Sequence, residues 1–539
     1  MKADVIISGQ ALFDSLNPEP YPGFVAVEDN RILAVEKGMD SLKDYLGENT
    51  HQIDAGDGLI MPAFFDSHTH LILAGMYQTC VNLGVSASEE EAAQMVKDYA
   101  DRNPGLDWII GFNWYHIFWE NKKLPVKETL DRLVPDRPVL LVNAEAHGAW
   151  VNSEALRRAG IDKDTPDPPY GKIHRDLSGE ATGILEESAL GLAGRIAFDF
   201  TPEQEKLYLR QYLRCAAESG ITAIKDMQPY FGRNLGSLEV YRSMEKTGEL
   251  TLRIHAAPDL LGDLQESIRL REQYQSPGIR VNHLKQFMDG VSTTHTALML
   301  EDYADGPPGD KGSPLGDLEA IKKAVAAAHN HSFSVCLHSC GDRSARLALD
   351  YIETAIGQHG PREVRHTIEH NELVDPADIP RFKQLGVIPS VMPDHLAMTP
   401  SFDETSYRVV MGEERSSRMF ALRSLYESTG VMAIGSDCPV VSQDPFLEIY
   451  RAVTRVHDDG EPAGGWTPEE KLTLYQVLRS YTYGSAYSAG VENDMGTLQP
   501  DKLADIIILN QNLFQIPVED IRKTKVSMTM MDGKVIHQR

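Results

Sequence analysis

Cysteine is scarce in this chain, and none of its five cysteines forms a Cys-x-x-Cys pair. A disulfide framework or a cysteine-type structural zinc site is therefore not expected. Long apolar runs are also missing: no stretch of about 18 apolar residues occurs, and the first residues lack a basic segment followed by a sustained apolar one. These absences argue against a membrane span and a signal peptide, and we expect a cytoplasmic protein.

Basic residues are in short supply relative to acidic ones. Lysine and arginine total 52 against 79 aspartates and glutamates, which leaves a formal net charge of −27 over 539 residues. Such a surface repels phosphate backbones and anionic lipid headgroups. We therefore expect a small-molecule substrate, with neither nucleic acid nor a membrane as a partner.

Short strand patterns mark both ends of the chain. Segments such as DVIISG and RILAVEKG in residues 1–60 are separated by turn-forming residues, and LADIIILN and KVSMTMMDGKVIHQ occupy residues 491–539. Asp532-Gly533 is a hairpin-turn signal within the last of these. Because the part between the ends alternates helix and strand patterns, the two ends are predicted to build one small β domain together.

The middle of the chain, residues 61–490, has the strand count of a TIM barrel. Eight strands followed by helices form a (β/α)₈ barrel, whose active sites lie at the carboxyl ends of the strands. The eight candidate strands lie in LIMPAFFDSHTH, ITAIKDM, LRIHAAP, NHLKQFM, FSVCLHS, RHTIEHN, GVIPSVM and VMAIGSD.

Spacing along the chain predicts an insert after the first strand. His338 and His370 are 32 residues apart, close to the roughly 31 of one strand–helix unit. From His70 to Lys285 the distance is 215 residues, where three units need about 95. We place the surplus in an insert at about residues 76–200. Its tryptophans form either a structural core for the insert or an aromatic wall over the barrel mouth, and they are Trp108, Trp114, Trp119 and Trp150.

Six residues able to hold metal ions recur in order beside these strands. The first two form a His-x-His pair, which one strand presents on the same face because side chains alternate with period two. One such pair is weak evidence, but the ordered set is strong. The six are His68 and His70 in FFDSHTH, Lys285 in HLKQFMDG, His338 in VCLHSCGD, His370 in RHTIEHNE and Asp437 in AIGSDCPV.

Lys285 is the unusual member, because a protonated lysine repels cations. In a buried, positive site its pKa falls, and the neutral amine can add carbon dioxide to form a carbamate able to bridge two cations. Two divalent ions would then share a hydroxide, since metal binding lowers the pKa of water to near 7. Asp437 could take the proton of that water and pass it to a leaving amine. Zinc suits these ligands, as do iron, manganese and nickel.

The chain resembles the amidohydrolase superfamily over essentially its whole length. The branch it is most similar to is amidohydrolase family three, which includes N-substituted formamide deformylases. Several of the matching segments are long and nearly diagnostic. They include MPAFFDSHTH, IIGFNW, LPVKETLDRLVPDRPVLL, AHGAWVNSEAL, GEATGILEE, LKQFMDG, LHSCGDRSARLALD, RHTIEHNEL, GVIPSVMP, GSDCPV and LADIIIL.

The resemblance implies a binuclear amidohydrolase that cleaves carbon–nitrogen bonds other than peptide bonds. It implies His68, His70 and Asp437 on one metal, His338 and His370 on the other, and carboxylated Lys285 as the bridge. It further implies that the terminal strands pack as a β-sandwich, and it suggests a homodimer.

Departures from the family pattern fall mostly where a substrate would be gripped. Tyr115 follows Trp114 where an aspartate is usual, Glu145-Ala146-His147 replaces Asp-Gly-His, and His295 replaces an arginine after the fourth strand. The metal chemistry is therefore expected to transfer, but the substrate is not. Trp114, Tyr115, His147, His295 and His395 are the candidate substrate-binding residues, and His147 is also a candidate for polarising the scissile carbonyl.

Other polar residues near the motifs have simpler interpretations. Cys336 and Cys340 flank His338 and are expected to fill the core, with a third ligand type or a redox role as the alternative. Asp66 is expected to orient a histidine, and Lys225 to form a structural ion pair.

Two other functions remain open. One is a mononuclear, deaminase-like hydrolase in which Lys285 is unmodified, and the other is a non-catalytic scaffold. Deaminases of that kind lack the bridging lysine, and a scaffold would be expected to have lost ligands. A metal count separates them from the leading hypothesis.

Overall fold

The computed structural model describes residues 2–144, 148–169, 171–230, 232–399, 401–402 and 406–539. The chain divides into two compact units. The first comprises Met1–Leu71, Leu213–Gln228 and Tyr241–Arg539, and the second comprises Ile72–Tyr212 and Pro229–Val240.

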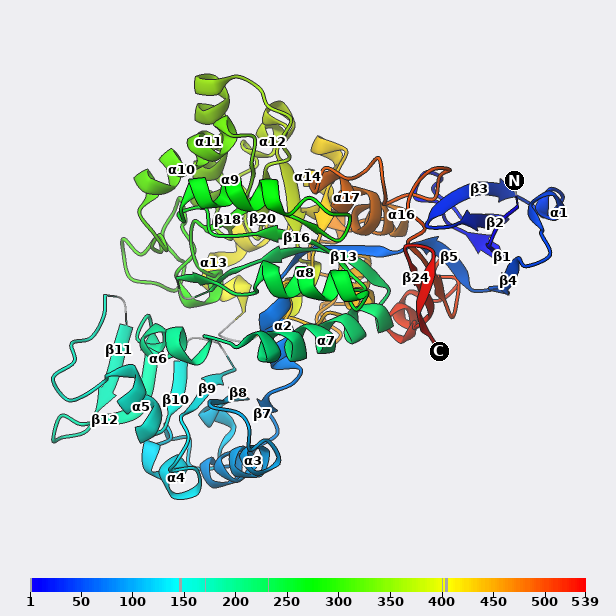
Figure 1. Ribbon diagram of the computed structural model, residues 1–539. Helices are drawn as coiled ribbons and strands as arrows, with labels where there is room; N and C mark the ends of the chain where they lie inside the picture. The colour runs from blue at the N-terminus through cyan, green and yellow to red at the C-terminus, as the bar shows by residue number, and fades with distance from the viewer. Residues whose placement is uncertain (1, 145–147, 170, 231, 400, 403–405) are drawn as a thin grey trace. The chain divides into compact units, whose positions relative to one another are not determined.

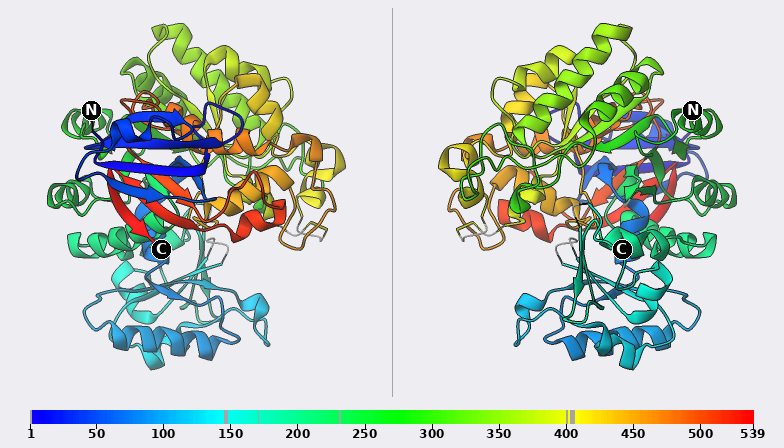
Figure 2. Two further views of the ribbon diagram at one scale, coloured as in Figure 1. Left: turned by 90° about the vertical axis from the view of Figure 1, so that its right-hand side faces the viewer. Right: turned by 90° about the vertical axis from the view of Figure 1, so that its left-hand side faces the viewer.

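Strands from both ends of the chain pair in one sheet of the first unit. Its order is β25-β24-β23-β5-β1-β2-β3, with β4 also paired to β1. Figures 1 and 2 show the N-terminal strands in blue beside the C-terminal strands in red. The strands are β1 (Val5–Leu12), β2 (Tyr21–Glu28), β3 (Arg31–Lys37), β4 (His51–Asp54), β5 (Leu59–Pro62), β23 (Ile506–Leu509), β24 (Val526–Met531) and β25 (Lys534–Gln538).

The predicted hairpin at the C-terminal end is present. β24 and β25 are antiparallel, and Met531 pairs with Lys534 across Asp532 and Gly533. Both turn residues have positive φ, +54° and +74°, as a two-residue turn of the type that matches strand twist requires.

All eight strand segments predicted for the middle of the chain contain strands, and these lie in two parallel sheets. One sheet has the order β17-β16-β13-β6 and the other β18-β19-β20-β21-β22. The two sheets are separate, so the closed barrel stays a prediction. Their strands are β6 (Phe64–Thr69), β13 (Ile221–Met227), β16 (Arg253–Ala257), β17 (Ile279–Arg280), β18 (His283–Phe287), β19 (Ser334–Ser339), β20 (Thr367–His370), β21 (Ile388–Val391) and β22 (Ala433–Ile434).

Hydrogen bonds connect the two parallel sheets at both of their junctions. The amide of Asp437, beyond β22, donates to the carbonyl of His68 in β6 at 2.7 Å. At the other junction, the amide of Lys285 in β18 donates to the carbonyl of Pro258, just after β16, at 2.8 Å. Gly435 permits the first approach, because a Cβ there would lie 2.5 Å from the backbone nitrogen of His68.

Helices alternate with these strands and bury apolar faces against them. Helix α11 presents Ala345, Ala348, Leu349 and Ile352 at helical spacing, and they pack in one core with strand residues such as Leu337. The remaining helices of at least six residues are α2 (Leu71–Tyr77), α3 (Glu89–Arg102), α4 (Lys127–Leu133), α5 (Ser153–Ala159), α6 (Leu190–Ala197), α7 (Pro202–Glu218), α8 (Leu238–Thr247), α9 (Leu264–Gln273), α10 (Leu318–Asn330), α12 (Ile379–Leu385), α13 (Tyr407–Ser416), α14 (Leu422–Thr429), α15 (Pro445–Thr454) and α16 (Leu474–Arg479), while α11 spans Asp342–His359. In the parts of the chain described, no helix has both the length and the apolar character needed to cross a membrane.

The second unit is organised around a mixed sheet of its own. Its order is β11-β12-β10-β9-β8-β7. Trp114, Trp119 and Trp150 are buried together in its core, with ring centroids 6.1–6.3 Å apart. These indoles therefore form a structural core. The strands are β7 (Val81–Asn82), β8 (Ile109–Trp114), β9 (Val139–Asn143), β10 (Gly148–Val151), β11 (Gly171–Arg175) and β12 (Ala181–Glu187).

Candidate metal centre

The six predicted ligands lie at or just beyond the carboxyl ends of parallel strands in the first unit. All except the half-buried His70 are buried. His68 lies in β6 and His70 follows it, Lys285 lies in β18, His338 in β19 and His370 ends β20, while Asp437 comes three residues after β22.

The side chain of Asp437, the last of the six ligands along the chain, lies against the first two, His68 and His70. Its Oδ1 lies 3.1 Å from Nε2 of His70 and 3.4 Å from Nε2 of His68. Nζ of Lys285 lies 3.5 Å from the same His68 nitrogen. The ring of His370 lies 5.0 Å from that of His68 and 4.1 Å from that of His338, measured between centroids. The six residues therefore meet in one place.

Hydrogen bonds determine which nitrogens of the His-x-His pair face this centre. Nδ1 of His68 donates to the carboxylate of Glu369 at 2.8 Å, and Nδ1 of His70 donates to the carbonyl of Met227 at 2.7 Å. A neutral ring with its proton on Nδ1 has a lone pair on Nε2. Both lone pairs face Asp437 Oδ1, which has no hydrogen-bond donor among the described residues. Three converging electron-pair donors are the arrangement that a cation stabilises.

Three histidines of the centre, His68, His338 and His370, are held in the neutral form that binds metals. Burial and, after it, the charge of Lys285 together lower the pKa of His68 to about 4. The same two causes lower the pKa of His338 to about 3. The pKa of His370 falls well below its ordinary value, first through burial and then through His338. At neutral pH these rings offer lone pairs rather than positive charge.

Lys285 is fully buried, and burial lowers its pKa. The carboxylates of Glu369 and Asp437 oppose that shift. Its ammonium group also lies 4.7 Å from the centre of the Phe287 ring. A buried lysine with a lowered pKa is the precondition for the predicted carbamate.

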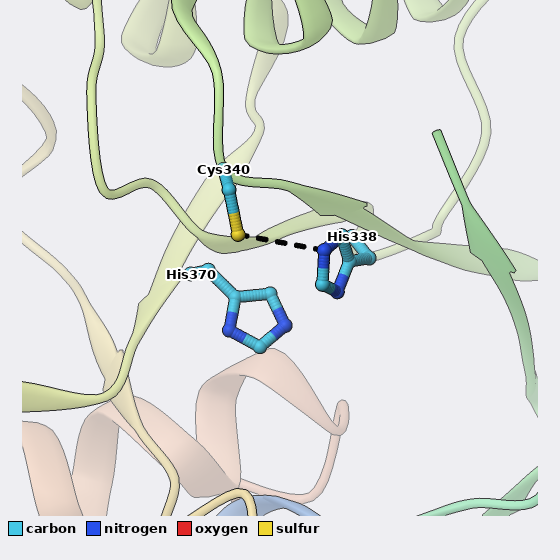
Figure 3. Close-up of side chains that lie close together, drawn as sticks. All are labelled: His338, Cys340 and His370. Atoms are coloured by element: carbon cyan, nitrogen blue, oxygen red, sulfur yellow. Dashed lines mark hydrogen bonds between the residues drawn. The ribbon is translucent and has the colours of Figure 1, made fainter. Parts of the chain in front are cut away.

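His370 belongs to two groups of potential ligands. His68, His370 and Asp437 can each place a ligand atom within 4.8 Å of the others, and so can His338, Cys340 and His370. Figure 3 shows the second group, with Cys340 and His338 side by side above the His370 ring. Both ring nitrogens of His370 are buried without a hydrogen-bond partner in the described structure. This donor set fits divalent metal ions.

Two of the candidate ligands have strained backbones. His370 has φ of +72° and Asp437 has φ of +53°. Residues with a Cβ rarely adopt such conformations, at a cost on the order of 1–3 kcal/mol each, and they are concentrated at functional sites.

Glu369 is not among the residues that the sequence indicates, yet its carboxylate contacts the centre through His68. Besides the His68 bond, its carboxylate accepts a bond from Thr367 Oγ1 and lies 3.9 Å from Nζ of Lys225. Burial alone would raise its pKa, but the Lys225 charge and the His68 bond hold it well below the ordinary value. A carboxylate that accepts from a ligating histidine fixes its tautomer and orientation. The available signal was an acidic residue directly before His370 in the same predicted strand.

Two supporting residues match their predicted roles in part. Asp66 accepts hydrogen bonds from the backbone of His68 and from the backbone and hydroxyl of Ser436, so it joins β6 to the loop carrying Asp437 rather than holding an imidazole ring. The ion pair predicted for Lys225 is formed with Glu369.

One of the candidate substrate-binding residues comes to the centre. His395 lies in a 3₁₀ turn (Pro393–Ala397), with Nε2 3.4 Å from Asp437 Oδ2 and its ring stacked 5.5 Å from that of His370. His295 instead pairs with Asp305 at 3.1 Å and Asp310 at 2.7 Å. Both of its ring nitrogens are thus engaged by carboxylates.

The remaining candidates belong to the second unit. Trp114 is buried there and its indole donates to the carbonyl of Leu141 at 2.8 Å. Tyr115 follows it, with its ring 6.1 Å from that of His116. His147 lies outside the described residues. Substrate contacts by these residues stay predictions.

Known proteins resemble this chain over nearly its full length. The amidohydrolase family profile matches residues 52–537. Protein LONG AFTER FAR-RED 3 of Arabidopsis thaliana is 30% identical over 99% of this chain and 92% of its own length, and N-substituted formamide deformylase of Arthrobacter pascens is 23% identical over 90% of each. An uncharacterized metal-dependent hydrolase from Pyrococcus horikoshii shares the fold with a TM-score of 0.80, at 24% identity over 96% of this chain and 99% of that one. The chain thus belongs to the amidohydrolase family and is a hydrolase acting on carbon–nitrogen bonds.

Proposed function

We propose that this protein hydrolyses an amide-type bond, other than a peptide bond, of a small organic substrate with two divalent metal ions. His68, His70 and Asp437 would hold one ion, and His338 and His370 the other. Lys285, carboxylated by carbon dioxide, would bridge them. Zinc suits this set, and iron, manganese or nickel would also fit.

The convergence of neutral donors on Asp437 and His370 carries the proposal. Imidazole lone pairs of the His-x-His pair face one carboxylate oxygen, and the buried His370 ring has two unbonded nitrogens among the described residues. A purely structural cluster would pair these atoms, because a buried polar atom without a partner costs about 1–3 kcal/mol. A bound cation supplies the missing partner.

The two oxygens of Asp437 face different groups. Oδ1 faces the His-x-His pair, while Oδ2 lies 3.4 Å from Nε2 of His395 and 4.0 Å from Nδ1 of His370. Bound divalent ions would supply polarisation that lowers the pKa of water to near 7. Oδ2 is then the base that takes a proton and returns it to the leaving amine.

His395 is placed to act on the substrate beside that base. Hydrogen bonding to Glu372 and the charge of Asp437 raise its pKa, against the opposing effect of burial. A protonated His395 can donate to the carbonyl oxygen of a bound amide while Asp437 handles the proton. The relative named for N-substituted formamides supports N-formyl and N-acyl amines as the first substrates to test.

The test combines metal analysis with a substrate panel. Protein stripped of metal and reloaded with zinc, manganese, iron or nickel should bind two ions per chain and release amine from some N-formyl, N-acetyl or N-acyl compound. One ion per chain with full activity would favour the mononuclear deaminase-like alternative. Hydrolysis that is unaffected by metal removal would refute the proposal.

We also propose the organisation around this centre. The two parallel sheets would form the halves of a (β/α)₈ barrel in residues 61–490, with an insert at about 76–200, and the hydrogen bonds at both junctions support this. Residues 1–60 and 491–539 would form the β-sandwich. A homodimer in the cytoplasm is the assembly and compartment we propose.

A further inference from the structure

Cys340 lies beside the two histidines proposed for the second metal ion. It directly follows β19, and its Sγ lies 3.4 Å from Nε2 of His338 (Figure 3). Sulfur and one ring nitrogen each from His338 and His370 lie within 4.8 Å of one another. Ligand atoms of a tetrahedral zinc ion, with Zn–S of about 2.3 Å and Zn–N of about 2.0 Å, are separated by roughly 3.5 Å. Small side-chain adjustments would bring the three atoms onto one ion.

The His370 ring supplies an independent indication that an ion belongs there. It is buried, and neither of its nitrogens has a hydrogen-bond partner among the residues described. In His338, Nε2 donates to the carbonyl of Gly290 at 3.1 Å, so the neutral ring offers its lone pair on Nδ1.

The turn that carries Cys340 is firmly positioned. Its amide donates to Oδ1 of Asp289 at 3.1 Å, and the amide of Gly341 donates to Oδ2 at 3.0 Å. A Cβ on Gly341 would lie 1.9 Å from the carbonyl oxygen of Leu298, so the chain passes too closely there for any larger residue. The sulfur is therefore held beside the two histidines by backbone contacts.

Cys336 provides a contrast on the same strand. It is equally buried, but it packs with Met227 and Ala257 in an apolar cluster. Only Cys340 of the two cysteines belongs to a group of potential ligands within the described structure. The core-filling interpretation therefore fits Cys336 and does not account for Cys340.

We propose that Cys340 is a further protein side chain on the second metal ion, beside His338, His370 and the bridging Lys285. This inference rests on the metal centre of the proposed function. As the sulfur binds the metal ion, the thiol would give up its proton to water. Thiolate is a soft ligand, so this position selects zinc or cobalt over manganese and magnesium.

Cobalt substitution tests the assignment independently of activity. The full chain loaded with cobalt should show a thiolate-to-cobalt charge-transfer band in the near ultraviolet. Cys340→Ala and Cys340→Ser should lose the band and bind one ion where the unaltered protein binds two. Cys336→Ala is the matched control and should keep both the band and two ions. A band that survives in Cys340→Ala, or its absence from unaltered protein holding two cobalt ions, would overturn the assignment and leave the proposed function standing.

Zinc X-ray absorption on the unaltered protein needs no variant and covers the case in which a variant fails to fold. We expect a sulfur scatterer at about 2.3 Å. Because the signal averages over both zinc ions and only one of them binds Cys340, its amplitude should correspond to one sulfur for every two zinc ions. Shells of nitrogen and oxygen alone would overturn the role of Cys340 while the binuclear centre stands. Failure of the unaltered protein to bind any metal would overturn both proposals.

Discussion

The carboxylate of Glu369 accepts a hydrogen bond from Nδ1 of His68 at 2.8 Å, between residues 301 positions apart in the chain. This contact sets the His68 proton on the far side of the ring from Asp437. It therefore makes Nε2 the ligand atom and increases its basicity.

Replacing Glu369 with glutamine should weaken metal binding without removing a ligand. The amide can still contact the imidazole, but it no longer carries the charge that holds the His68 proton on Nδ1. We expect the affinity for the metal ion held by His68, His70 and Asp437 to fall about 10–100-fold, measured by competition with a chelator. Glu90→Gln, at an exposed position on α3, is the control and should bind normally. Unchanged affinity in Glu369→Gln would show that the contact is not needed for the metal.

Replacing Lys285 with alanine should reduce bound metal below two ions per chain and abolish hydrolysis. The carbamate itself can be observed directly, because protein equilibrated with ¹³C-labelled bicarbonate should show a carbamate signal by NMR that Lys285→Ala lacks. Lys97→Ala, which removes a surface lysine paired with Asp101, is the control for nonspecific labelling. Two ions and full activity in Lys285→Ala would contradict the bridging role.

Asp437→Asn should lower kcat by about 10²–10⁴-fold, since it removes the group that accepts the proton. The amide oxygen retains some ability to bind the ion, so metal content should fall less than activity. Comparing kcat with bound metal at saturating zinc separates the two roles. Loss of activity strictly in proportion to lost metal would indicate that Asp437 acts only as a ligand.

The metal-free protein should lose stability on acidification from pH 6.5 toward pH 4. The pKa of His68 is lowered to about 4 and that of His338 to about 3, so across this window the unfolded chain binds protons that the folded chain does not. Stability therefore rises with pH, and the contribution of His68 is on the order of 3 kcal/mol.

Urea unfolding at a series of pH values measures this dependence. His338→Asn should flatten the slope, whereas His51→Asn, at an exposed position in β4, should leave it unchanged. A stability that is flat from pH 7 to pH 4 would show that these rings are already solvated or protonated.

Arg253→Met should destabilise the first unit by about 3–5 kcal/mol. The guanidinium of Arg253 in β16 makes two 3.0 Å bonds to the buried Asp505, just before β23, and one of 3.0 Å to Asp532. Methionine fills similar space but leaves the Asp505 charge buried and unpaired. Arg269→Met breaks an exposed pair with Glu266 and should change the urea midpoint by little. Equal effects of the two changes would contradict this account.

Local patterns predicted the strands well because each is decided by neighbouring residues. LRIHAAP contains β16 and GVIPSVM contains β21, and the Asp532-Gly533 turn follows from two residues that tolerate positive φ. His395 was also a candidate from its place after the seventh strand. His295 was selected in the same way, but Asp305 and Asp310 engage its ring. The position of a loop residue in a motif therefore does not determine which residues its side chain contacts.

The sequence alone determined the ordered ligand set, the strands that carry it and the family to which the chain belongs. These depend on residue type and spacing, which are local properties. Only the tertiary structure decided which nitrogen of His68 faces Asp437, that Glu369 holds it there, and that Cys340 rather than Cys336 adjoins two histidines. Those facts depend on contacts between strands distant in the chain. A shift of an ångström or a change of tautomer alters them without altering any sequence pattern.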